Sequence, residues 1–294
     1  MLQRLLYESF GLGIERARRF VEHEDRSIFQ QGAGNGIGRA VALKLASEGA
    51  NVVVNDLEDA PAMAVVEEIT AAGGHAISVP GSVTEDGFAE RFIGAGIEKW
   101  NAVDIIVNNA GYTWDSMIGH MSDDQFDAML DVHVKAPFRI LRAASGFIKG
   151  AAKQEAEEGR EVFRKVVNIS SVAGLGGNVG QANYSSAKAA IVGLTKTMAK
   201  EWGRSKVCVN CVAFGYIETR LTEATDEKKT ITVDGNEVGI GIPTKVAGGF
   251  AAMVPMGRGG TPEEAAGGVY LFCIPESNYV SGQVLTVGGG FTLG

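Results

Sequence analysis

Short runs of consecutive apolar, often β-branched residues alternate along this chain with longer segments of helical periodicity. We predict strands at seven runs of four to seven residues: 27–30, 51–56, 75–81, 103–109, 165–170, 207–213 and 283–287. Several runs are apolar on successive residues, which is typical of strands that helices cover on both faces. The alternation predicts an α/β fold, a doubly wound domain with a central parallel sheet of about seven strands.

The pattern continues without a break from the first strand onward. No internal repeat, linker or shift in composition occurs, so residues 25–294 are predicted to form one domain. Residues 1–24 precede it as an N-terminal arm. The arm lacks the apolar core of a secretory signal, and although its arginines faintly resemble a transit peptide, Glu8 and Glu15 favour a short surface helix.

Two segments look like additions to the alternating pattern. Residues 149–165 form a charged helical stretch before the fifth strand, and residues 228–243 place two alternating arms around Asp234-Gly235. An Asp-Gly pair between such arms is a strong β-hairpin signal. The hairpin would project after the sixth strand, where α/β sheets bind ligands, so it either decorates the fold or covers the substrate pocket.

Composition narrows the classes of partner. The 294 residues carry a formal charge of −8, and 45% are hydrophobic and 21% charged. The hydrophobic and charged fractions are typical of a soluble globular protein. The negative net charge argues against a nucleic-acid partner, which usually requires a basic surface. The longest uncharged run, residues 166–187, is rich in Gly, Ser and Asn and is a poor membrane span. We expect a cytoplasmic protein with a small-molecule partner and no membrane partner.

The cysteines and histidines predict neither a disulfide framework nor a metal site. Cys208 and Cys211 lie in an alternating segment, where residues three apart point to opposite faces of a strand. The four histidines, at positions 23, 75, 120 and 133, have no ligand spacing. A reducing compartment is the expected setting for such a chain.

A glycine-rich turn follows the first strand and opens a helix. Gly32, Gly36 and Gly38 allow a sharp bend and a close approach of the backbone to a pyrophosphate. The helix that begins there offers free N–H groups and the positive end of its dipole. Between a strand and an amphipathic helix, this spacing favours a Rossmann-type nucleotide site over an ordinary glycine loop.

The second strand ends at Asp56, which lies 18 residues beyond Gly38. Dinucleotide-binding folds place a carboxylate near this separation, where it binds the adenosine ribose hydroxyls. The same carboxylate would repel a 2′-phosphate, and no Arg or Lys stands beside it or inside the glycine turn. The predicted cofactor is therefore NAD, with NADP as an alternative. The simpler interpretation is a solvated aspartate at a strand end.

Tyr184 and Lys188 are four residues apart in a helical pattern, so their side chains share one face. Taken alone, the pair is compatible with a packing tyrosine and a solvated lysine. A free phenol has a pKa of about 10, which is too high for an efficient base at neutral pH. A neighbouring ammonium would favour the phenolate and lower that pKa, so the pair is also compatible with proton transfer.

Five motifs occur in a fixed order along the chain: GAGNGIG at 32–38, NNAG at 108–111, NISS at 168–171, YSSAK at 184–188 and GYIET at 215–219. Ser171 and Tyr184 are 13 residues apart. In these features residues 25–290 resemble the short-chain dehydrogenase/reductase family, and most of all its 3-oxoacyl-thioester reductase-like members.

The resemblance implies an oxidoreductase that interconverts a secondary alcohol and a ketone. Tyr184 would be the general acid/base, Lys188 would support it and hold the nicotinamide ribose, and Ser171 would orient the substrate oxygen. The resemblance also implies a homotetramer or homodimer and permits a bulky or acyl-thioester substrate. Together with the glycine turn and Asp56, it places the cofactor against Gly32, Asn35, Gly36, Ile37, Gly38, Asp56, Leu57, Ser82, Val83, Asn109, Ala110, Gly111, Tyr184, Lys188, Ile217 and Thr219.

The chain departs from the family pattern at His133, where an asparagine is usual. A histidine there could order a water beneath Lys188, and it adds a group that titrates near neutral pH. It is equally compatible with a core histidine that kinks its helix. We therefore treat His133 as a fourth candidate for the catalytic group.

The chain also departs from the family pattern at positions near the expected cofactor site. Ser82 stands where an aspartate commonly meets adenine, and Phe214 where a proline normally precedes Gly215. Gln30 and Gln31 replace an apolar residue and a threonine at the end of the first strand. A buried Gln30 needs hydrogen-bond partners, or it costs about 1–3 kcal/mol.

Three alternative functions remain open from the sequence. An NADPH-dependent 3-oxoacyl-ACP or 3-oxoacyl-CoA reductase is the nearest, and Asp56 argues against it. A nucleotide-binding sensor or scaffold without turnover would explain the departures but not the retained Ser171, Tyr184 and Lys188. A SAM-dependent methyltransferase would share the glycine turn and the acidic strand end, but it gives no role to the lysine.

Overall fold

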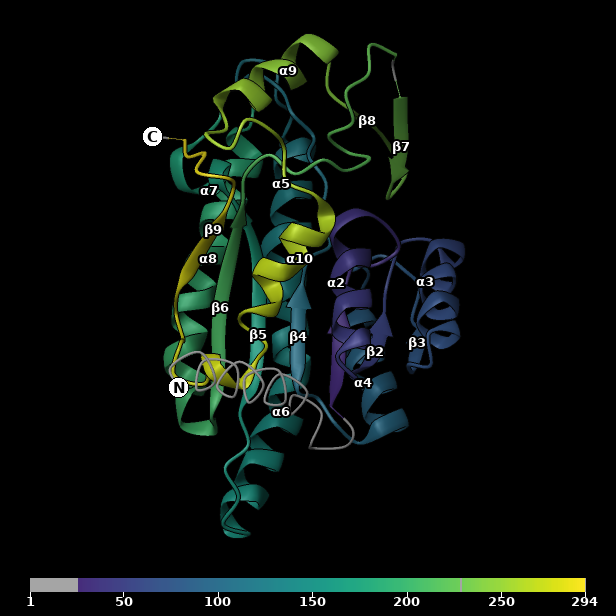
Figure 1. The fold of residues 1–294 in the computed structure, drawn as a ribbon, viewed down its shortest axis with the longest axis vertical. Coiled ribbons are helices and arrows are strands. Elements are labelled where there is room, and N and C mark those ends of the chain that lie inside the picture. Colours follow the sequence, from purple (N-terminus) through teal and green to yellow (C-terminus); the bar gives the residue numbers. More distant parts are fainter. Residues whose placement is uncertain (1–25, 228, 294) are drawn as a thin grey trace, which may run out of the picture.

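The computed structural model describes residues 26–227 and 229–293 and is drawn in Figure 1. At its centre is a seven-stranded sheet of order β3-β2-β1-β4-β5-β6-β9, in which every neighbouring pair is parallel. This confirms the predicted α/β, doubly wound fold. The predicted N-terminal arm, 1–24, lies outside the described residues. The strands are β1 (Ser27–Gln30), β2 (Asn51–Val54), β3 (Ala76–Ser78), β4 (Ile105–Asn108), β5 (Arg164–Ser171), β6 (Val207–Phe214) and β9 (Val284–Val287).

Helices cover both faces of this sheet, which explains the continuous apolar runs. Val52, Val53 and Val54 are each 0% exposed although successive side chains point to opposite faces. One face packs against α2 (Gly36–Ser47), α3 (Asp59–Ala71) and α10 (Pro262–Tyr270). The other packs against α4 (Phe88–Trp100), α6 (Ala136–Glu157) and α8 (Ala182–Trp202). Shorter helices complete the fold: α5 (Asp123–Leu130), η2 (Asp131–Lys135), α7 (Val172–Gly176), η3 (Gly203–Ser205), α9 (Thr244–Met253) and η4 (Pro275–Ser277).

The third strand is shorter than the sequence predicts. The run 75–81 pairs regularly with β2 only through Ala76–Ser78. Pro80 follows two residues later and has no N–H to donate to a ladder. Gly81 then adopts a φ of 131°, which ends the extended segment. The strand therefore stops early and leaves its continuation to form the wall of a crevice.

Two helices, α5 and α10, begin with a capping box. Ser122 accepts a hydrogen bond from the N–H of Gln125, whose side chain in turn accepts from the N–H of Ser122. Thr261 and Glu264 form the same reciprocal box at the start of α10. Each box satisfies two N–H groups that a helix end leaves without partners.

The charged stretch at 149–165 is not a separate helix. Residues up to Glu157 continue α6, and Arg164 already belongs to β5. The turn between them is fastened by a buried ion pair, in which the guanidinium of Arg164 donates to both carboxylate oxygens of Glu155 at 2.8 and 2.6 Å. Such a bidentate pair satisfies both charges inside the fold. The stretch is therefore an extension of α6 that returns to the sheet.

Within the segment predicted as a hairpin, 228–243, residues 229–240 form the hairpin that the Asp-Gly pair predicts. β7 (Lys229–Val233) and β8 (Asn236–Ile240) are antiparallel, and both turn residues have positive φ, 48° at Asp234 and 83° at Gly235. This is the backbone of a two-residue hairpin turn in which a glycine is strongly preferred. In Figure 1 the hairpin stands beyond the carboxyl ends of the strands, beside the loops that precede α2 and α3.

The two close cysteines lie on opposite faces of β6, as alternation requires. Cys208 Sγ contacts the carbonyl of Asn278, whereas Cys211 lies on the α8 side near Lys188. Within residues 26–227 and 229–293, no three His, Cys, Asp or Glu side chains converge as metal ligands. None of the helices in these ranges combines the length and apolar character of a membrane span.

The strand order reverses direction between β1 and β4. From β1 the chain proceeds outward to β2 and β3, and from β4 it proceeds the other way to β5, β6 and β9. The loops that leave β1 and β4 therefore diverge and open a crevice at the carboxyl edge. Doubly wound proteins bind their ligands at such a switch point.

Candidate active site

The crevice is a cavity of ≈ 1420 Å³ along the carboxyl edge of the sheet. Loops after β1, β2, β3, β4, β5 and β6 line it, together with residues of the β7–β8 hairpin. Every candidate residue chosen from the sequence lines it: Gly32, Asn35, Gly36, Ile37, Gly38, Asp56, Leu57, Ser82, Val83, Asn109, Ala110, Gly111, His133, Ser171, Tyr184, Lys188, Ile217 and Thr219. The fold thus brings together residues that are far apart in the chain.

The glycine turn presents bare backbone to this cavity. Gly36, the first residue of α2, has a φ of 52°, a conformation that disfavours side chains. A Cβ on Gly38 would lie 1.9 Å from the carbonyl oxygen of Gly32, so a side chain there would push α2 off the turn. The side chain of Asn109 closes the turn from the β4 side by donating to the carbonyls of Gln31 and Gly32, both at 3.3 Å.

Asp56 holds this turn against the end of β2. Its Oδ2 accepts from the N–H of Gly34 and its Oδ1 from the N–H of Leu57, both at 2.9 Å. A Cβ on Gly34 would lie 2.7 Å from that Oδ2, so Gly34 is a required glycine that the sequence analysis did not single out. Each carboxylate oxygen has a further lone pair, so Asp56 can still accept from a ligand hydroxyl.

The tip of the hairpin reaches the β3 side of the crevice. Asp234 Oδ2 accepts from Ser82 Oγ at 3.2 Å and from Thr84 Oγ1 at 3.1 Å, contacts that span 152 and 150 residues of sequence. The hairpin is seated by Val238, which is 1% exposed and belongs to the same apolar cluster as Tyr112. Ser82 stands where an aspartate is common in the family. In this structure a carboxylate still lies beside that position, but Asp234 of the hairpin supplies it.

The polar residues at the end of β1 join a hydrogen-bond chain across the sheet. Gln31 donates to Asn108 (2.9 Å), Asn108 to Asn168 (2.7 Å), and Asn168 to Thr195 of α8 (2.9 Å). This hydrogen-bond chain links the end of β1 to α8, the helix that carries Tyr184. Gln30 is 0% exposed, and its amide donates to the carbonyl of Gln31, but its Oε1 has no partner in the described part of the chain.

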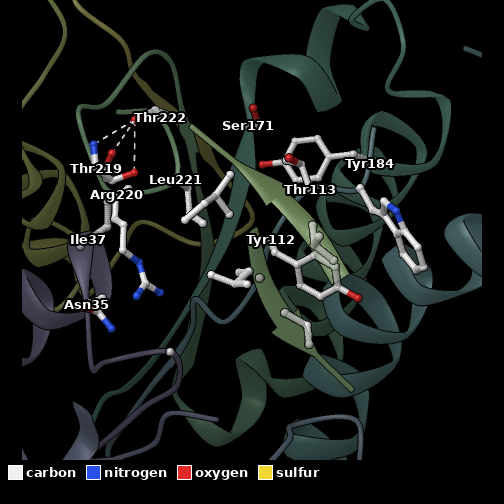
Figure 2. Close-up of a pocket in the computed structure, with 18 of the residues that line it drawn as sticks. Asn35, Ile37, Tyr112, Thr113, Ser171, Tyr184, Thr219, Arg220, Leu221 and Thr222 are labelled. Atoms are coloured by element: carbon white, nitrogen blue, oxygen red, sulfur yellow. Dashed lines mark hydrogen bonds between the residues drawn. The ribbon is translucent and has the colours of Figure 1, made fainter. Parts of the chain in front are cut away.

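Tyr184, Lys188 and Ser171 converge on the far side of the cavity. Lys188 Nζ lies 5.6 Å from the centre of the Tyr184 ring and donates to the carbonyl of Ile169 at 2.9 Å. Ser171 ends β5 and caps α7, accepting from the N–H of Ala173 at 3.2 Å. Figure 2 shows Ser171 and Tyr184 together with Thr113 on this side. The helical spacing thus produces the shared face that the sequence predicts.

The start of α8 is fixed by long-range bonds. The side chain of Asn183, which is 0% exposed, donates to the carbonyls of Trp114 and Gln125, both at 3.0 Å, and accepts from the N–H of Tyr184. Farther along, Ser170 Oγ donates to the carbonyl of Lys188 at 2.7 Å. The positions of the phenol and the ammonium are therefore set by β5 and by the β4 loop.

The protonation states differ from what the Tyr-Lys spacing alone indicates. Burial raises the pKa of Tyr184 to about 12, against a smaller opposing effect of a hydrogen bond with Ser171. Burial also lowers the pKa of Lys188 to about 8. The phenol pKa is raised in this structure because loss of solvation, together with the nearby Asp115 carboxylate, outweighs the hydrogen bond with Ser171. At neutral pH Tyr184 is a neutral phenol, which is a proton donor.

His133 is placed beneath this group by a π-helical turn, η2. Its Nε2 lies 2.8 Å from the carbonyl oxygen of Tyr112, and its ring meets the Tyr184 ring edge-on with centres 5.1 Å apart. Its Nδ1 is buried and has no partner among the described residues. Burial lowers the pKa of His133 well below its ordinary value, so the imidazole is neutral. A Cβ on Gly111 would lie 2.2 Å from the ring, so that glycine makes room for it.

The loop after β6 forms the third wall. Phe214, in place of the usual proline, is 6% exposed and packs in the apolar cluster between the sheet and α10. Beyond it the backbone is tied into a tight turn, because Thr222 Oγ1 donates to the carbonyl of Ile217 at 2.5 Å and accepts from the N–H of Thr219 at 2.9 Å. Thr219 packs on the glycine turn, with its side chain 3.5 Å from where a Gly36 Cβ would lie.

Several lining residues were missed from the sequence. Tyr112 and Thr113 directly follow the NNAG motif, and Arg220 directly follows GYIET, so their positions beside motifs were the available signal. Thr222 has no such signal, because its role in the turn appears only in three dimensions. Of these, Arg220 adds a positive charge on the glycine-turn side (Figure 2).

The sequence profile described as short chain dehydrogenase matches residues 26–230. The chain therefore belongs to the short-chain dehydrogenase/reductase family, whose members are NAD(P)-dependent oxidoreductases that act on CH–OH and C=O groups.

Individual relatives agree with this assignment. The chain is similar to a 3-oxoacyl-[acyl-carrier-protein] reductase of Synechocystis sp., with 38% identity over 89% of this chain and 95% of the relative. It is also similar to the enzyme of that name from Thermotoga maritima, with 33% identity over 89% and 96% of the two chains. Among solved structures, a dehydrogenase/reductase from Sinorhizobium meliloti has a TM-score of 0.77 and 28% identity, over 94% of this chain and 98% of that one.

Proposed function

We propose that this protein is an NAD(H)-preferring reductase of 3-oxoacyl thioesters or related ketones, with Tyr184 as its general acid/base. The observation that carries the proposal is the convergence of Tyr184, Lys188 and Ser171 at the carboxyl edge of the sheet, opposite a glycine turn with bare backbone. The names of the relatives support the thioester class.

The residues present fit a nicotinamide dinucleotide. The glycine turn would hold the diphosphate at the N-terminus of α2, and Asp56 would accept from the adenosine ribose hydroxyls. Lys188 would donate to the nicotinamide ribose. When bound, the cofactor supplies the hydride that is added to, or removed from, the substrate carbon. The positions of Ile217 and Thr219 support contacts with the nicotinamide end.

Tyr184 would then move the proton. Because its pKa is raised to about 12, the phenol is protonated at neutral pH and can donate to a carbonyl oxygen as that carbon is reduced. Ser171 would hydrogen-bond the same oxygen and orient it. In the reverse direction the phenolate would take the hydroxyl proton, and the Lys188 ammonium would stabilise that phenolate.

His133 would act as a positioning residue in this scheme. Its imidazole packs edge-on against Tyr184. Because the neutral ring carries its proton on Nε2, which donates to the carbonyl of Tyr112, Nδ1 is left as a hydrogen-bond acceptor. That arrangement favours participation over a purely structural role, because a satisfied core histidine would use both nitrogens.

Cofactor and substrate are tested together by following nicotinamide absorbance with NADH and NADPH against acetoacetyl-CoA and a panel of simple ketones. We expect turnover of the thioester with a higher kcat/KM for NADH than for NADPH. A strong preference for NADPH would contradict the ribose argument. Tight cofactor binding with no turnover of any carbonyl compound would instead support the sensor or scaffold alternative.

Replacing Asp56 with alanine is expected to reduce the preference for NADH over NADPH by about tenfold or more. The carboxylate is the negative group that would face a 2′-phosphate, and like charges a few ångströms apart cost about 1 kcal/mol or more near a protein surface. The measurement is the ratio of kcat/KM for the two cofactors. Asp56→Asn removes the charge and, with its single carbonyl oxygen, can keep one of the two bonds to the N–H groups of Gly34 and Leu57.

The matched control is Asp59→Asn, which removes a nearby exposed carboxylate that does not line the cavity. It should leave the ratio unchanged. An unchanged ratio in both Asp56 variants would mean that another group selects the cofactor.

A further inference from the structure

One positively charged side chain that lines the cavity, that of Arg220, has no role in the proposed chemistry. Three positively charged side chains line the cavity: Lys188, Lys229 and Arg220. Lys188 belongs to the proton-transfer side, and Lys229 forms an ion pair with Glu223 at 3.0 Å. Arg220 is exposed and, within residues 26–227 and 229–293, has neither an ion-pair nor a hydrogen-bond partner. An exposed guanidinium without an anion, facing a cavity, is suited to bind one from solution.

The position of Arg220 is set by the wall that faces the glycine turn. The two threonines on either side of it fix its backbone, since Thr222 binds both Ile217 and Thr219. Thr219 itself packs against Gly36. Figure 2 shows the Arg220 side chain extending along this wall toward Ile37 and Asn35, at the start of α2.

These observations together indicate a site for a phosphate group between the start of α2 and Arg220. The N-terminus of α2 supplies N–H groups from one side, and Arg220 supplies a charged planar donor from the other. A guanidinium recognises phosphate oxygens by paired hydrogen bonds and remains charged at all physiological pH values. We propose that Arg220 is a cofactor-binding residue that contacts the diphosphate from the β6 loop. This rests on the proposed dinucleotide site and adds a determinant that neither the glycine turn nor Asp56 provides.

The test measures binding rather than turnover. We expect Arg220→Met to weaken the binding of NADH, NADPH and ADP by similar factors of about tenfold or more, as measured by isothermal titration, and to leave adenosine binding unchanged. The dependence of the NADH dissociation constant on salt should also become shallower. Arg220→Lys, which keeps the charge, should recover part of the loss.

Arg204→Met is the matched control. It removes the same charge from an exposed position in η3, which precedes β6 and does not line the cavity, so NADH binding should not change.

Other outcomes overturn the proposal in distinguishable ways. Equal losses of affinity for adenosine and for ADP would mean that Arg220 stabilises the loop and does not bind the phosphates. A loss confined to NADPH would assign Arg220 to the 2′-phosphate. Unchanged binding of all four ligands in Arg220→Met would remove Arg220 from the site while leaving the proposed function standing. Failure of the wild-type protein to bind NADH and NADPH would contradict both the Arg220 assignment and the proposed function.

Discussion

Tyr184→Phe is expected to lower kcat for carbonyl reduction by at least about a hundredfold while NADH binding changes by less than about threefold. General acid catalysis by a positioned side chain contributes factors of about 10²–10⁴, and phenylalanine has no proton to give. The ring itself would remain, with its edge-on contact to His133. The measurement combines steady-state kinetics with titration of NADH into the variant.

Tyr112→Phe is the control for this substitution. Tyr112 lines the same cavity, is 8% exposed and also has a pKa raised to about 12, but it lies outside the Ser171 and Lys188 group. Its loss of a hydroxyl should reduce kcat far less. If Tyr184→Phe retained a tenth or more of wild-type kcat, the proton would have to come from another group, and the assignment of Tyr184 would be wrong.

Lys188→Met is expected to lower kcat/KM by about a hundredfold or more and to weaken NADH binding as well. Lys188 is 4% exposed, lies 5.6 Å from the Tyr184 ring centre and would hold the nicotinamide ribose, so its loss affects both proton transfer and cofactor affinity. Methionine fills similar space without a charge. Kinetics and NADH titration together distinguish this double effect from the selective effect of Tyr184→Phe.

The pH dependence of the wild-type enzyme provides an independent check on Lys188. Because its pKa is lowered to about 8, the ammonium is lost as pH rises through that value, and kcat/KM for reduction should fall above about pH 8. Lys188→Arg keeps its charge and, to the extent that it is active, should lack this fall. A wild-type profile that stays flat to pH 10 would show that the charge of Lys188 is not required.

The free energy of unfolding should change with pH in the opposite direction to kcat/KM. The unfolded chain holds the Lys188 proton up to the ordinary pKa of 10.5, whereas the folded chain releases it near 8. Between these values the unfolded state binds more protons, so the free energy of unfolding contributed by Lys188 rises with pH. Urea unfolding at pH 7.5 and 9.5 should show this rise in the wild type and not in Lys188→Met.

The parts of this protein that could be predicted from sequence are those with local causes. Seven strands were predicted because residues buried on both faces are apolar at successive positions, as in Val52–Val54. The hairpin was predicted because Asp-Gly satisfies a two-residue turn with positive φ. The shared face of Tyr184 and Lys188 follows from a helical repeat, which four residues of spacing already determine.

The family resemblance extended this further, because it named residues from the ends of six strands and the loops after them, which the structure brings to one cavity. It did not indicate Arg220, which lies beside a motif but outside it. Nor did it indicate that Asp234, 152 residues from Ser82 in the chain, stands next to it in space. A contact of this kind depends on the length and direction of a hairpin relative to the sheet, and no local pattern encodes it.

The protonation states were also decided by tertiary structure alone. From the sequence, an ammonium one turn away from Tyr184 indicates a lowered phenol pKa, but packing of α8 against the sheet removes solvent from both groups and reverses the direction for the phenol. Residue spacing determines which groups meet, because a helix has a fixed period. Desolvation determines which of them carries a proton, because it depends on everything that packs around them.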